Sequence, residues 1–210
     1  MRARWTACVR CDVCCSDAPP NRFHGFQRGL AASPDVARIR AAIYRQIAVA
    51  YALGLRDQAD EDADFGVAPD AQLHLTIQGR TPTKALGLAT IRTDELSSML
   101  ATSKPLIMDT LWNFMDRSLP GAVGLKRSGA GGTFLDTSQD RLRHRMPELT
   151  DNDTSMPIVV VGYSSERFDG YNLALRLVNL GYTKVYWYRG GRETWEARGL
   201  PEANLVPQDW

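Results

Sequence analysis

The side chains best suited to chemistry stand together in one short polar segment, residues 162–170, between two apolar stretches. Arg167 carries a guanidinium, which can bind an oxyanion through two parallel hydrogen bonds. Serine hydroxyls and glycine backbone N–H groups are further donors in the same segment. The segment of residues 162–170 is therefore predicted to be a loop that can bind a small anion. The residues of this candidate loop are Gly162, Tyr163, Ser164, Ser165, Glu166, Arg167, Asp169 and Gly170.

A second interpretation of the same loop needs no ligand. Arg167 can pair with a nearby carboxylate and so close the pocket. The acids in question are Glu166, Asp169 and Asp109. Both interpretations stay open, because the sequence does not show which group Arg167 faces.

The elements around this loop are a strand before it and a helix after it. Ile158–Val161 is a continuous β-branched run, typical of a strand buried on both faces. Apolar residues recur at helical spacing over residues 171–180, and Gly181 is expected to end that helix. Residues 184–188 predict a second strand. The result is a βαβ unit, in which ligands lie beyond the carboxyl end of the strand, at the positive end of the helix.

With its flanking motifs, this unit resembles the rhodanese family of sulfurtransferase-like domains. The resemblance covers about residues 90–201 and rests on LIMD at 106–109, LPGAVGL at 119–125 and VYWYRGGRETWEARGLP at 185–201. It implies an α/β fold: a single rhodanese-like domain with a mainly parallel central sheet flanked by helices, preceded by a helical or extended N-terminal region. The chain also resembles the bacterial branch associated with PQQ-dependent catabolism, whose members carry Tyr-Asn or Trp-Asn at the start of the helix, as Tyr171-Asn172 does here.

The resemblance also implies a catalytic cysteine, which this chain lacks in the domain. In rhodaneses a thiolate at the amino end of the helix takes up sulfane sulfur and passes it on. The corresponding position is Gly162 or Tyr163, depending on a one-residue gap, and the second cysteine of the related branch falls at Arg167. No cysteine follows the N-terminal group of four, Cys8, Cys11, Cys14 and Cys15.

We therefore expect a rhodanese-like protein that is not an active thiosulfate sulfurtransferase but a non-catalytic binding or regulatory module. The alternative is a sulfurtransferase that uses the N-terminal cysteines or the thiol of a partner. A relic of the family without a retained biochemical role is a third possibility. Ser164 and Ser165 do not replace the cysteine, because a serine hydroxyl needs a general base and cannot form a persulfide.

Other residues are expected to support the loop. The resemblance implies that Asp109, at the carboxyl end of a strand over residues 105–109, positions the loop by hydrogen bonding. Asn172 is expected to bind loop backbone near the helix start. The glycine-rich stretch 126–133 lacks the Gly-Lys-Ser/Thr ending of a phosphate-binding P-loop, so we expect a flexible connector there. Trp187 and Trp195 are expected in the core. No cofactor is predicted.

Three more elements are expected before the central unit. Residues 89–91 predict a strand. Thr93 is a candidate cap for a helix whose apolar face carries Leu96, Met99 and Leu100. Residues 138–149 predict a basic helix with a solvated charged face.

The chain is expected to divide into four segments: a poorly ordered, cysteine-containing extension at 1–34, an amphipathic helix or signal-like segment at 35–56, an acidic linker and extended arm at 57–84, and the rhodanese-like domain at 85–205. The cysteine spacing is one that metal sites use, but no scaffold accompanies it, so we predict no metal site. The chain as written is expected in the cytoplasm. If residues 36–58 act as a signal from a later start, the protein is exported to the periplasm.

Charge and hydropathy narrow the range of partners. The formal net charge of the 210 residues is +1, which offers no electrostatic basis for binding nucleic acid. No apolar run is long enough for an integral membrane segment. The expected partner is therefore an unknown protein or a small oxyanion.

Overall fold

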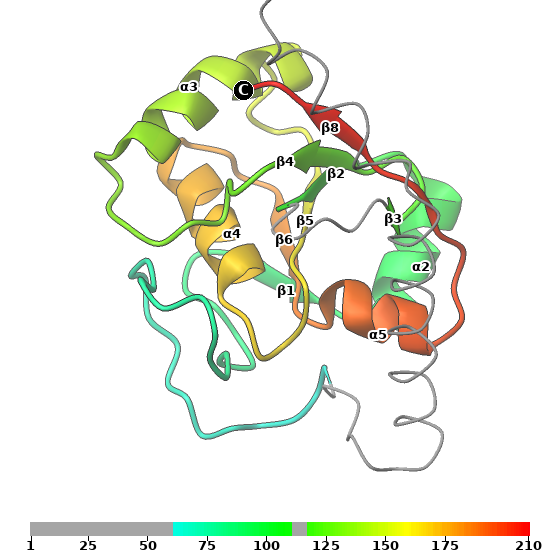
Figure 1. Cartoon of the computed structure of the whole chain (residues 1–210). Helices are drawn as coiled ribbons and strands as arrows, with labels where there is room; N and C mark the ends of the chain where they lie inside the picture. The colour runs from blue at the N-terminus through cyan, green and yellow to red at the C-terminus, as the bar shows by residue number, and fades with distance from the viewer. Residues whose placement is uncertain (1–60, 111–116) are drawn as a thin grey trace, which may run out of the picture. The chain divides into compact units, whose positions relative to one another are not determined.

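The strand that precedes the candidate loop lies at the centre of a parallel sheet (Figure 1). The structure, a computed structural model, describes residues 61–110 and 117–210. All four side chains of β5 (Ile158–Val161) are buried, and β5 pairs in parallel with β2 (Leu106–Asp109) and β6 (Val185–Tyr188). A strand with neighbours on both sides and apolar side chains on both faces is what a continuous β-branched run predicts.

Three further strands complete the six-stranded sheet, and all of its pairings are parallel. β1 (Ala89–Ile91) lies beside β6, whereas β4 (Val123–Leu125) and β8 (Val206–Gln208) continue the sheet beyond β2. The order is β1-β6-β5-β2-β4-β8. A separate antiparallel pair is formed by β3 (Arg117–Ser118) and β7 (Ala203–Asn204).

Helices cover both faces of this sheet (Figure 1). α3 (Thr137–Leu149) and α4 (Asp169–Asn179) lie on one face, and α2 (Thr93–Thr102) and α5 (Gly191–Ala197) lie on the other. Because side chains of a strand alternate between faces, Ile158 and Val160 belong to the core under α3 and α4. Val159 and Val161 belong to the core under α2 and α5. The expected α/β architecture is confirmed.

α4 is buried around almost its whole circumference. Every residue from Asp169 to Leu177 is buried, including the polar Asn172 and Arg176. The sheet covers the apolar side of the helix, while the arm of residues 61–84 and the glycine-rich loop cover its polar side. The helix ends as expected, with Gly181 at a φ of 93°.

The arm, residues 61–84, runs in extended form along the candidate loop rather than along a sheet edge. Backbone hydrogen bonds join Gly79 N to Glu166 O and Thr81 N to Ser165 O, both at 3.0 Å, and Phe168 N to Ile77 O at 2.9 Å. Within residues 61–110 and 117–210, one isolated β-bridge lies outside the named strands, and it pairs Gln78 with Arg167 in antiparallel orientation. The arm therefore holds the loop from outside.

Several sequence-based expectations need correction. α2 begins at Thr93, so the cap position belongs to Arg92, whose N–H donates to the Glu95 carboxylate at 2.9 Å. Thr93 instead donates its N–H and hydroxyl to Glu61 of the arm, at 2.9 and 2.8 Å. α5, β3, β7 and β8 were not predicted. The segments expected at 1–34 and 35–56 lie outside the described residues.

Candidate functional site

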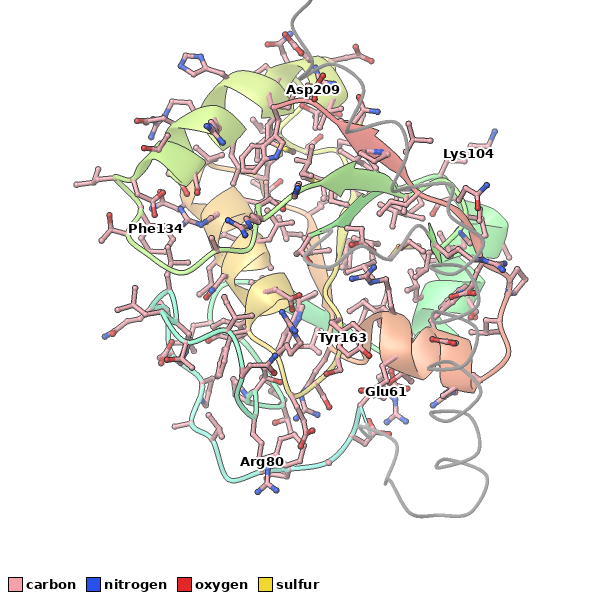
Figure 2. All side chains as sticks on the ribbon, in the orientation of Figure 1. Glu61, Arg80, Lys104, Phe134, Tyr163 and Asp209 are labelled. Atoms are coloured by element: carbon pink, nitrogen blue, oxygen red, sulfur yellow. The ribbon has the colours of Figure 1, made fainter. Side chains whose placement is uncertain are left out.

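The loop of residues 162–168 connects the carboxyl end of β5 to the first turn of α4. Figure 2 shows Tyr163 between the start of α4 and α5. Ser164, Ser165 and Arg167 are buried, whereas Tyr163 is half-buried. The predicted loop thus lies where a βαβ unit places a ligand, but its polar groups face inward.

The anion at the start of α4 is the chain's own Asp169. Its Oδ1 accepts hydrogen bonds from the N–H groups of Gly170 at 3.0 Å and Tyr163 at 3.4 Å. Its Oδ2 accepts from the Thr110 hydroxyl at 3.2 Å, and the whole residue is inaccessible to solvent. The positive end of a helix stabilises such a carboxylate, as it would stabilise a bound anion.

This carboxylate also fills the space beside Gly162, one of the two positions at which the family resemblance predicts the cysteine. A Cβ on Gly162 would lie 2.7 Å from Asp169 Oδ1 and 2.7 Å from Gly170 N. Gly162 has no positive φ, so close approach and not backbone conformation requires the glycine. Any side chain here would have to displace the first turn of α4.

Two buried arginines flank the ring of Tyr163. The Arg167 guanidinium carbon lies 5.6 Å from the ring centroid, and that of Arg192 lies 5.9 Å from it. Arg167 Nε is 3.7 Å from Asp169 Oδ2, and Arg192 Nε is 3.4 Å from Asp109 Oδ2. Of the acids considered as partners of Arg167, the structure therefore places Asp169 beside it. Sequence reasoning missed Arg192, whose only signal is its place directly after the Gly-Gly turn.

Asp109 and Asn172, the two residues expected to position the loop, also contact other parts of the domain. Asp109 accepts a hydrogen bond from the Ser118 hydroxyl at 2.6 Å and lies beside Arg192. Asn172 exchanges two hydrogen bonds of 2.9 Å with the backbone of His74 and donates to Gly129 O at 3.1 Å. The Asn172 side chain therefore ties α4 to the arm and to the glycine-rich loop, while its backbone N–H donates to Phe168 O of the candidate loop at 2.8 Å.

The glycine-rich loop is packed, in contrast to the flexible connector expected. A Cβ on Gly129 would lie 2.0 Å from Asp169 O, and a Cβ on Gly131 would lie 2.3 Å from His74 O. Arg176 donates to Ala130 O at 3.0 Å and to Thr133 O at 3.2 Å. The glycines thus let the loop approach α4 and the arm closely, which explains their number without a phosphate.

Of the remaining loop residues, Glu166 contacts the arm and Ser164 contacts Glu166. Glu166 lies 3.7 Å from the Arg80 guanidinium at the surface, and the Ser164 hydroxyl accepts from Glu166 N at 3.3 Å. Burial raises the pKa of Tyr171, in the first turn of α4, to about 12, although the Asp70 N–H donates a hydrogen bond to its oxygen at 3.3 Å, which works to lower that pKa. Trp187 and Trp195 are core residues, as predicted.

Neither a metal centre nor a membrane span was found in the described part of the chain. Residues 61–110 and 117–210 contain no group of three or more His, Cys, Asp or Glu side chains that could hold a metal ion. Within the same ranges, no helix has the length and apolar character needed to cross a bilayer.

A pocket of about 610 Å³ lies away from the candidate loop, against α2, α5 and the amino end of β2.

A family model described as Rhodanese-like domain matches residues 92–198, which is 107 of the 210 residues. The chain belongs to the rhodanese-like family. The matched range of this rhodanese-like domain contains the candidate loop, Asp109 and Arg192, but neither the arm nor β8. No curated protein matches the chain.

Solved structures to which the chain is similar include enzymes of two kinds. Thiosulfate sulfurtransferase from Pseudomonas aeruginosa is 19% identical, with a TM-score of 0.43, over 58% of this chain and 21% of that chain. A Rhodanese-like domain from Anabaena is 19% identical, with a TM-score of 0.41, over 58% and 88% of the two chains. A yeast protein tyrosine phosphatase of the Rhodanese family is 15% identical, with a TM-score of 0.42, over 59% and 96%.

Proposed function

We propose that this rhodanese-like domain is a non-catalytic binding or regulatory module rather than a sulfurtransferase. The observation that carries the proposal is the filling of the space beside Gly162, one of the two positions at which the family resemblance predicts the cysteine. Gly162 has no side chain, and the space that a side chain would need is occupied by the Asp169 carboxylate and the backbone of Gly170. The loop keeps an anion at the amino end of the helix, but that anion is part of the chain.

No other loop residue is equipped to replace the thiolate. Sulfur transfer needs a group that can bond to sulfane sulfur and release it, and serine and tyrosine oxygens cannot form a persulfide. Nucleophilic serine also needs a neighbouring general base. His74 is the histidine of the arm, but it stacks on Phe168 at a centroid distance of 3.7 Å and lies 3.4 Å from the Asp70 carboxylate.

Sulfur transfer from thiosulfate to cyanide by the full chain tests the proposal. We expect no activity above the buffer rate, and the same result for a variant in which Cys8, Cys11, Cys14 and Cys15 are all replaced by serine. Activity of the full chain that disappears in this variant would establish the N-terminal thiols as the nucleophiles and refute the proposal.

A Gly162→Cys variant tests the steric part of the reasoning. We expect it to remain inactive, because its side chain cannot enter the position beside Asp169 without moving α4. Circular dichroism should accompany the assay, so that an inactive folded protein is distinguished from an unfolded one. Persulfide formation on a folded Gly162→Cys variant would show that the space is available.

A further inference from the structure

Arg192 has unused hydrogen-bonding capacity in a buried position. Its exposed fraction is 3%, and none of its three guanidinium nitrogens makes a hydrogen bond in the described part of the chain. A guanidinium carries five N–H donors, and buried polar groups in proteins are nearly always hydrogen-bonded. The side chain therefore has donors that no hydrogen bond in the described part of the chain uses.

The carboxylates near Arg192 accept hydrogen bonds from other groups and not from its guanidinium. Asp109 Oδ2 lies 3.4 Å from Arg192 Nε, but the same oxygen accepts a short hydrogen bond, 2.6 Å, from the Ser118 hydroxyl. Asp169 accepts hydrogen bonds from the loop N–H groups and Thr110, so an external anion has no access to those donors. The ring of Tyr163 lies beside Arg192, with its centroid 5.9 Å from the guanidinium carbon.

The charge around Arg192 restricts the class of ligand. The two arginines beside Tyr163 are matched by two buried carboxylates, Asp109 and Asp169. A doubly charged anion would leave two buried charges without a counterion, which is costly in a low-dielectric interior. A singly charged, planar oxyanion adds one charge and matches the fork of a guanidinium with two parallel hydrogen bonds.

We propose that Arg192 is the receptor of a small carboxylate, which it binds through its guanidinium fork beside Asp109 and Tyr163. This inference rests on the proposed function as a binding module and names the ligand class of that module. The site belongs to α5 and the end of β2, and it is distinct from the loop donors that Asp169 already uses.

The Nε–H resonances of arginine in a ¹⁵N-labelled full chain provide a direct test. Sodium acetate and sodium sulfate are titrated separately at constant ionic strength, and the Arg192 resonance is assigned from its absence in Arg192→Lys. We expect acetate to shift this resonance saturably, and sulfate to bind at least about tenfold more weakly. No saturable shift, or equal binding of the two anions, would overturn the inference.

Two variants and a matched control complete the test. Arg192→Lys keeps the charge but loses the fork, so acetate affinity, followed by the amide resonances of α5, should fall about tenfold or more. Arg192→Met should remove binding. Arg143→Met alters an exposed arginine that pairs with Asp140 on α3, and it should leave acetate binding unchanged.

The outcomes separate this inference from the proposed function. Unchanged acetate binding in a folded Arg192→Lys protein would show that another group is the receptor. Absence of acetate binding together with absence of sulfur transfer would leave the non-catalytic assignment standing and remove only the role of Arg192. Sulfur transfer together with acetate binding at Arg192 would refute the non-catalytic assignment and leave the role of Arg192 standing.

Discussion

A methyl group at Gly162 tests whether Asp169 fills the nucleophile position. In Gly162→Ala, the new Cβ would lie 2.7 Å from both Asp169 Oδ1 and Gly170 N, whereas ordinary van der Waals contact begins at 3.4 Å. The shortfall is about 0.7 Å on two sides. The strand end cannot retreat, because β5 is paired with β2 on one side and β6 on the other.

The expected cost follows from overpacking. Adding a methyl group to a close-packed site lowers the free energy of unfolding by about 1–3 kcal/mol. Asp169→Ala removes a buried carboxylate that accepts from two backbone N–H groups and a hydroxyl, and leaves Arg167 without that neighbour. Breaking a buried charge interaction of this kind costs about 3–5 kcal/mol.

The double variant is the informative one. Removal of the Asp169 carboxylate relieves the contact with Oδ1 but not the contact with Gly170 N. We therefore expect Gly162→Ala to be less damaging in the Asp169→Ala background, by about 1 kcal/mol, so that the two changes are not additive. Strictly additive effects would mean that Asp169 does not occupy the space beside Gly162.

Equilibrium unfolding of the full chain in guanidinium chloride, followed by tryptophan fluorescence and circular dichroism, measures these differences. Gly79→Ala is a suitable control, because its Cβ would meet only the edge of the Phe168 ring at 3.0 Å, and a side chain can move. A loss below about 0.5 kcal/mol for Gly162→Ala, no greater than that of an ordinary surface substitution, would refute the steric reasoning.

Two pH-dependent predictions concern the groups that hold α4. Burial works to raise the pKa of Asp136, but hydrogen bonds from Arg176 and from the N–H groups of Gln139 and Thr133 outweigh it and lower that pKa below 3.8. The stability that the ionised Asp136 contributes is present above pH 3.8 and is lost as the pH falls through its lower folded pKa. Asp136→Asn should therefore lower the free energy of unfolding by about 1–3 kcal/mol at neutral pH and by little in acid. An equal loss at both pH values in guanidinium unfolding would contradict this prediction. Burial raises the pKa of Tyr171 from 10.0 to about 12, so stability should fall between these values as the unfolded phenol ionises first. Tyr171→Phe should flatten this alkaline fall in thermal unfolding, and an unchanged slope would exclude Tyr171 as its cause.

Much of the sheet could be predicted because its signals are local. The bounds of β5 and β1 agree with the predicted strands, and β2, β6 and α4 differ from prediction only near their ends. Continuous β-branched runs, helical spacing of apolar residues and a terminal glycine are properties of adjacent residues. The elements that were missed are short: α5 has seven residues, β3 and β7 have two each, and β8 has three. Such segments carry too little periodicity to be recognised.

The contacts of polar side chains were predicted less well. Asn172 and Thr93 are correctly placed at helix starts, but their partners, His74, Gly129 and Glu61, lie far away in the sequence. The glycine-rich loop has a composition that suggests mobility, whereas its glycines allow close packing against α4. Composition describes what a segment can do alone, and not what the rest of the fold places against it.

The sequence by itself determined the rhodanese-like βαβ framework and the absence of any cysteine after Cys15. Only the tertiary structure decided that Asp169 fills the space beside Gly162 and that Arg192 and Asp109 come together beside Tyr163. The physical reason is the difference in range. Strands and helices follow from neighbouring residues, whereas the occupancy of a buried polar position depends on which distant side chains packing brings to the carboxyl edge of the sheet.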